Sequence, residues 1–213
     1  MMECDDLPSA VKARVVGIAK RKNGQRYGHI TYQDHYSYAG EIYPIRAKPS
    51  GCYTDILRSI IERMLAMRSL YGRVLLVVFE LHHQQFGEKN EMVSAFIKSA
   101  RAHVQNRYQT PDLGFVWVRE QENTKGRHYH LFLMVDGDKV RSPLGANGLS
   151  NALKDIWQRK GGTIHHSGYH FIDDDQSFNE AFEHTSYMAK ARGKGYRSDG
   201  VRDFGASQTA TPF

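Results

Sequence analysis

Two apolar segments, separated by a short polar stretch, limit the folds that are open to this chain. Residues 114–122 (GFVWVREQE) and 128–135 (HYHLFLMV) are rich in β-branched and aromatic side chains, and the sequence Asn-Thr-Lys-Gly lies between them. Such segments on either side of turn-forming residues predict an antiparallel hairpin. A denser apolar run, VLLVVFEL, lies within residues 73–83 and predicts a central strand. The chain is therefore expected to be built around an antiparallel sheet.

Helices are expected between these strands. Over residues 54–70 apolar side chains recur at helical spacing, and Thr54 is a suitable N-cap. The same reasoning gives a set of further elements: helices at 90–106, 147–159 and 177–193, short strands within 27–46, and one short strand near 169–173. The pattern predicts an α+β fold, a central antiparallel sheet with helices packed on one face, ferredoxin-like or related.

The length and the composition limit the number of domains and the cellular compartment that we expect for the chain. The 213 residues suit one principal domain, predicted at 51–195, after a basic, tyrosine-rich segment at 1–50 and before a flexible, glycine-containing tail at 196–213. Two cysteines are too few for a disulfide framework and fit a reducing cytoplasm. No apolar run approaches the ~20 residues that span a bilayer, and the N-terminus lacks a signal-peptide core. A cytoplasmic protein without a membrane partner is expected.

The charge distribution favours a polyanionic partner. The net charge is +6 and the isoelectric point is about 9.3. A basic stretch near the N-terminus is followed by several tyrosines, a combination that can neutralise phosphates and stack unpaired bases. The alternative is a solvated basic face beside tyrosines that pack in a sheet. The residues expected to bind DNA are Lys20, Arg21, Lys22, Arg26, Arg192 and Lys194.

The predicted hairpin carries a candidate metal site. His128 and His130 are separated by one strand residue, so both side chains point to the same face. If Glu122 pairs with His128, Glu120 faces His130, and opposed β-carbons are only about 5 Å apart. One carboxylate and two imidazoles then converge on a divalent cation, Mn²⁺ or Mg²⁺, with the imidazoles favouring Mn²⁺. Glu122 is the reserve ligand if the register differs. The alternative is an exposed hairpin with surface ion pairs.

A candidate nucleophile lies in the last predicted helix. Tyr187 and Lys190 are three residues apart and so share one face of the helix predicted at 177–193. A tyrosine beside a metal site can attack a phosphodiester, and a nearby ammonium can offset the charge that develops in the transition state. The alternative is that Tyr187 packs against the sheet and Lys190 is solvated.

Taken in order, these motifs resemble those of the HUH endonuclease superfamily. The motifs are Glu120, then His128-Tyr129-His130, then Tyr187-Met-Ala-Lys190. Their order is similar to that of single-tyrosine rolling-circle replication initiators. The segments FVWVRE, GRHYHLFLMV and YMAKARGK look most like the replication-initiator-like proteins of filamentous phages and prophages. The resemblance covers residues 54–194, and the first motif of the family has only a poor counterpart at 77–81.

The resemblance implies an HUH-type replication-initiator fold and a metal-dependent enzyme that nicks single-stranded DNA at an origin. Tyr187 would form a 5′-phosphotyrosine link and leave a free 3′-hydroxyl, with Lys190 stabilising charge nearby. No GxxxxGK[ST] motif occurs, so a helicase and a polymerase would come from the host or another gene. Self-association would allow another protomer to supply a second tyrosine. The alternatives are a transposase-like strand transferase and a non-catalytic, basic DNA-binding prophage protein.

Overall fold

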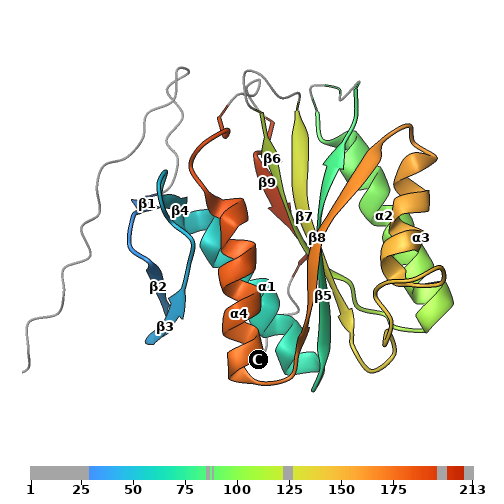
Figure 1. The fold of residues 1–213 in the computed structure, drawn as a ribbon, viewed down its shortest axis with the longest axis horizontal. Helices are drawn as coiled ribbons and strands as arrows, with labels where there is room; N and C mark the ends of the chain where they lie inside the picture. The colour runs from blue at the N-terminus through green and yellow to red at the C-terminus, as the bar shows by residue number, and fades with distance from the viewer. Residues whose placement is uncertain (1–28, 85–86, 88, 122–126, 196–200, 209–213) are drawn as a thin grey trace, which may run out of the picture.

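The computed structural model describes residues 29–84, 87, 89–121, 127–195 and 201–208, and a five-stranded antiparallel sheet forms their centre (Figure 1). The strand order is β8-β5-β7-β6-β9. The predicted α+β class, with a central antiparallel sheet and helices packed on it, is confirmed. The strands of the sheet are β5 (Val74–His82), β6 (Gly114–Glu120), β7 (His128–Asp136), β8 (Thr163–Ile172) and β9 (Phe204–Ala206).

Helices cover both faces of this sheet, so the prediction of helices on one face is wrong. Helices α1 (Thr54–Leu70) and α4 (Asp175–Ser186) lie on one side, and α2 (Glu91–Tyr108) and α3 (Leu149–Gln158) lie on the other (Figure 1). A strand that is buried on both faces reads as a continuous apolar run. β5 has that sequence, and its first six residues are all buried. Among the described residues, no helix has the length and apolar character needed to cross a membrane.

Alternate residues of β5 belong to two separate hydrophobic cores. Val74, Leu76 and Val78 pack toward α1 and α4, on what we call the α1/α4 face. Leu75, Val77, Phe79 and Leu81 pack toward α2 and α3, on the α2/α3 face. On the α1/α4 face the next two positions along the strand are Glu80 and His82. The apolar core on that face therefore ends where polar side chains begin.

Two small sheets precede α1 and pack on the same domain. β1 (Ile30–Thr31) pairs with β4 (Cys52–Tyr53), and β2 (His35–Tyr38) pairs with β3 (Glu41–Pro44). The ring of Tyr43 lies 5.6 Å from that of Phe182 on α4. Ile30 and Ile45 are buried in the core of the α1/α4 face. Residues 30–50 therefore belong to the domain, and the predicted boundary at residue 50 does not divide the structure.

Helix α1 has the predicted bounds, but the prediction of Thr54 as its N-cap is wrong. The N-cap is Tyr53, without a side-chain capping bond, and the Thr54 hydroxyl donates to the His29 carbonyl at 3.0 Å. The strand predicted near 169–173 is β8, which begins earlier, at Thr163. The helix predicted at 177–193 also differs, because α4 ends at Ser186 and a 3₁₀ turn, η1 (Tyr187–Ala189), follows it.

The segment 196–213, predicted to be a flexible tail, contains an edge strand of the sheet. β9 pairs with β6, with Gly205 opposite Trp117. A β-carbon at Gly205 would lie 2.7 Å from atoms of the indole ring. Glycine therefore allows the strand to approach Trp117. The prediction is wrong for residues 204–206, because the glycines that suggested flexibility include one that a close contact requires.

Candidate metal centre

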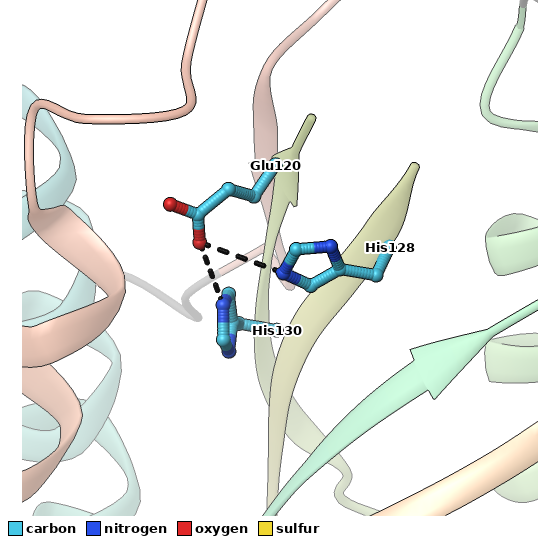
Figure 2. A group of neighbouring side chains, drawn as sticks. All are labelled: Glu120, His128 and His130. Atoms are coloured by element: carbon cyan, nitrogen blue, oxygen red, sulfur yellow. Dashed lines mark hydrogen bonds and ion pairs between the residues drawn. The ribbon is translucent and has the colours of Figure 1, made fainter. Parts of the chain in front are cut away.

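Three polar side chains converge at one end of β6 and β7, on the α1/α4 face. Glu120 Oε2 lies 2.7 Å from His130 Nε2 and 3.7 Å from His128 Nε2 (Figure 2). One donor atom of each residue lies within 4.8 Å of the others. The three residues are 4%, 7% and 6% exposed, in the order Glu120, His128 and His130. These residues could hold a metal ion, as the sequence predicted.

The pairing that brings them together differs from the predicted one. Glu120 lies opposite His128, and Val118 lies opposite His130. The hairpin is therefore shifted by two residues from the prediction, which placed Glu120 opposite His130. A shift of two residues returns every side chain to its original face, because strand side chains alternate. The three side chains converge in either register. Glu122, the reserve ligand, lies outside the described residues.

The environment of Glu120 favours its ionised form. Burial alone would raise the pKa of this carboxyl group. Hydrogen bonds with His128 and His130, together with the charge of Lys194, outweigh burial and hold the pKa of Glu120 well below its usual range. The centre therefore presents a carboxylate beside two imidazoles.

A second carboxylate supports the centre from β5. Glu80 lies directly opposite His130, and its Oε1 is 3.4 Å from His130 Nδ1. Its Oε2 is 3.2 Å from Nε2 of His82, whose ring stacks on His128 with centroids 5.2 Å apart. A carboxylate on the outer nitrogen of a histidine ligand fixes its tautomer and orientation. Neither Glu80 nor His82 was predicted from the sequence to belong to the site. The sequence signal that could have indicated Glu80 is that it is a lone acidic residue in the apolar run VLLVVFEL.

Tyr187 lies beside this centre at the end of α4. Its ring centroid is 5.8 Å from that of His130. The Lys190 ammonium lies 4.5 Å from the centroid of the tyrosine ring, and Arg192 Nη2 donates to the phenolic oxygen at 2.6 Å. The predicted nucleophile and the predicted metal ligands are therefore neighbours. The group at the hydroxyl is Arg192, whereas Lys190 lies over the ring.

Lys194 does not form part of a DNA-binding surface, and that prediction is wrong. Its side chain is 0% exposed, and its ammonium donates to the Lys190 carbonyl and lies 4.0 Å from Glu120 Oε1. A buried ammonium cannot reach a phosphate in solvent. Arg192 is exposed. The other predicted DNA-binding residues, Lys20, Arg21, Lys22 and Arg26, lie outside the described residues.

Gly193 packs against the Glu120 side chain on one side of the centre. Its φ angle is +70°, and a β-carbon there would lie 2.5 Å from Glu120 Cγ and Oε1. Its carbonyl accepts a hydrogen bond of 2.8 Å from the backbone N–H of Gln121. Only glycine combines this backbone conformation with so close an approach. The segment 190–194, which follows Tyr187, is therefore packed directly on the carboxylate.

The family to which the chain belongs follows from comparison with known proteins. A family model described as the YagK/YfjJ C-terminal domain matches residues 42–207. The chain belongs to this family. No curated protein matches the sequence, and no solved structure does.

The matched range shows how far the YagK/YfjJ-type domain extends. It begins within β3, before the predicted boundary at residue 50, and it runs past β9. The candidate metal centre, Tyr187 and Lys194 therefore all belong to this domain. The family description states no activity, so the resemblance to HUH endonucleases stays a prediction from the motifs.

Proposed function

We propose that this protein is a metal-dependent endonuclease that nicks single-stranded DNA at an origin and so starts rolling-circle replication. One observation carries the proposal. Tyr187 lies in ring contact with His130, a member of the buried Glu120-His128-His130 group. A nucleophile and a candidate metal centre thus lie side by side, and covalent phosphodiester cleavage requires both.

The donor set suits a divalent cation. Glu120 would supply one carboxylate oxygen, and His128 and His130 would each supply Nε2. Two imidazoles beside one carboxylate favour Mn²⁺ over Mg²⁺, which prefers oxygen ligands. When bound, such an ion supplies Lewis acidity to a phosphoryl oxygen of the scissile phosphodiester.

Tyr187 supplies the nucleophile in this proposal. Its phenolic oxygen attacks phosphorus, the bond from phosphorus to the 3′ oxygen breaks, and the phenolic proton ends on that 3′ oxygen. The products are a 5′-phosphotyrosine and a free 3′-hydroxyl that a polymerase can extend. The Arg192 guanidinium already donates to the phenolic oxygen, and Lys190 lies over the ring. Both cations would stabilise negative charge on the phenol as it attacks, and again when it leaves during rejoining.

Single-stranded DNA is the proposed partner. Arg192 is exposed and adjoins Tyr187, so it can meet a phosphate at the reactive position. A helicase and a polymerase would come from other genes, and a second nick would need another protomer or a second round at Tyr187. A transposase-like strand transferase would use the same chemistry on different DNA ends.

Cleavage of a labelled single-stranded oligonucleotide pool with Mn²⁺ tests the proposal. The wild type should give a nick and a covalent protein–DNA adduct on a denaturing gel, and Tyr187→Phe should lose both. Tyr169→Phe, at an exposed tyrosine on β8, is the matched control and should keep both. An adduct that persists in Tyr187→Phe would place the nucleophile elsewhere. Binding without any cleavage would favour the DNA-binding module, and a requirement for transposon ends would favour the transferase.

A further inference from the structure

A buried lysine adjoins the candidate metal centre, and the nicking mechanism does not use it. The Lys194 side chain is 0% exposed, and its pKa is lowered by burial. Burying a charge is unfavourable unless the charge is paired and hydrogen-bonded. The ammonium has both kinds of partner, because it donates to the Lys190 carbonyl and lies 4.0 Å from Glu120 Oε1.

The two oxygens of Glu120 therefore have different neighbours. Oε2 lies 2.7 Å from His130 Nε2 and 3.7 Å from His128 Nε2, whereas Oε1 lies near the ammonium of Lys194. Figure 2 shows one carboxylate oxygen directed at both imidazoles and the other directed away from them. Only one oxygen of Glu120 faces the position that a metal would take between the three ligands.

The lysine is held where it is by the packing around it. Its hydrogen bond to the Lys190 carbonyl ties it to its own segment, and Gly193 packs on the Glu120 side chain. Glu120 is the charged residue with the largest effect on the ammonium, and the buried Asp203 has a smaller one. The ammonium thus cannot leave for solvent without moving the segment that follows Tyr187.

We propose that Lys194 is an internal counter-cation of Glu120 that weakens the binding of a divalent metal. Its positive charge also makes the surroundings of the bound ion more favourable for a phosphate. Glu120 and Lys194 together carry no net charge, so the donor set attracts a divalent cation less than a free carboxylate and two imidazoles would. Repulsion between the ammonium and a divalent cation acts in the same direction at this depth of burial. The proposal rests on the metal centre of the proposed function, but not on nicking activity.

Titration of the full chain with Mn²⁺, followed by the electron paramagnetic resonance signal of the free ion, tests this role. Lys194→Met removes the charge and the hydrogen bond, whereas Lys194→Gln removes the charge and keeps a donor for the Lys190 carbonyl. Both should raise Mn²⁺ affinity by about tenfold or more. Lys154→Met changes the net charge equally at an exposed position on α3 and should leave the affinity unchanged. Circular dichroism identifies any variant that does not fold, and the conservative Gln variant then carries the test.

The outcomes distinguish failure of the counter-cation from failure of the proposed endonuclease. An affinity that is unchanged or lower in both Lys194 variants would overturn the counter-cation. Binding that appears only when Lys194 is replaced would support it in its strongest form. If no variant binds Mn²⁺, both the metal centre and the counter-cation fail. If affinity rises as expected and no DNA is nicked, the counter-cation stands and the proposed endonuclease falls.

Discussion

The two faces of β7 differ at the end that carries the candidate site, although alternate residues of one short stretch of strand form both faces. On the α2/α3 face, Tyr129 and Leu131 are buried in a continuous core, and the Tyr129 hydroxyl donates to Asn90 at 2.8 Å. On the α1/α4 face, the alternate residues His128 and His130 are also buried but face a carboxylate. Burial alone therefore does not separate the structural residues from the candidate site. What separates them is whether the partners are apolar or ionisable.

The layer that covers the α1/α4 face changes along β7. Phe132, two residues beyond His130, is again in the apolar core with α1 and α4. At the level of the histidines, the segment that follows α4 covers this face of the sheet in place of the helices. Tyr187 lies beside His130 there, and Lys194 lies beside Glu120. The site thus lies where the helical layer gives way to an irregular segment, which is where close polar contacts can be made.

The largest expected effect comes from truncating neighbouring residues that face opposite ways. His130→Ala should abolish Mn²⁺ binding and nicking, because it removes a ligand and the neighbour of Tyr187, and it should also lower metal-free stability, because buried Glu120 loses a hydrogen-bond partner. Leu131→Ala should lower the free energy of unfolding by about 2–5 kcal/mol and leave Mn²⁺ affinity intact, because it empties space in an apolar core. Urea unfolding with a chelator and Mn²⁺ titration measure the two effects. Mn²⁺ binding that survives in His130→Ala, or that is lost in a folded Leu131→Ala, would contradict the division between the faces.

A smaller effect is expected from Glu80, which supports the site without belonging to the three candidate ligands. Glu80→Gln should lower Mn²⁺ affinity by roughly 10- to 100-fold, because the carboxylate that orients His130 through Nδ1 is lost. Isothermal titration with Mn²⁺ gives the affinity. Glu62→Gln, at a partly exposed position on α1, is the matched control and should have no effect. An unchanged affinity in Glu80→Gln would show that His130 is oriented without it.

Local sequence patterns account for the elements and for which side chains share a face. Helical spacing of apolar residues gave both ends of α1, and alternation placed His128 and His130 together. Alternation cannot reveal a register error of two residues, because side chains repeat with that period. The wrong pairing of Glu120 and the correct convergence of the three side chains therefore have the same cause.

Contacts between distant segments could not be read from the sequence. Glu80 meets His130 across two paired strands that lie fifty residues apart in the chain, and no local pattern links them. Gly205 lies in the segment predicted to be a flexible tail, yet it makes room for a close approach to Trp117, and Gly193 makes room for a close approach to Glu120. Lys194 belonged to a run of basic residues, and only the fold shows that its ammonium is enclosed.

The smallest expected effect concerns a polar contact on the α1/α4 face away from the metal centre. His170 Nε2 lies 2.8 Å from His184 Nδ1, joining β8 to α4. Burial, then the charges of His170 and Arg46, lower the pKa of His184 from 6.5 to about 4. Above pH 6.5 this group is neutral whether the chain is folded or unfolded, so it contributes no pH dependence there. Between pH 6.5 and 4 the unfolded chain binds the proton more readily, so stability should fall as the pH is lowered.

Replacing this histidine should flatten the acid limb of the stability curve. His184→Asn keeps a polar side chain near His170 and removes the titrating imidazole, so its midpoint of thermal unfolding should decline less than that of wild type between pH 6.5 and 4. His29→Asn, at an exposed histidine, should follow the wild-type curve and serves as the control. Scans need to be made without metal, because metal binding to histidine and carboxylate ligands itself depends on pH. Parallel curves for wild type and His184→Asn would show that this pair makes no measurable contribution.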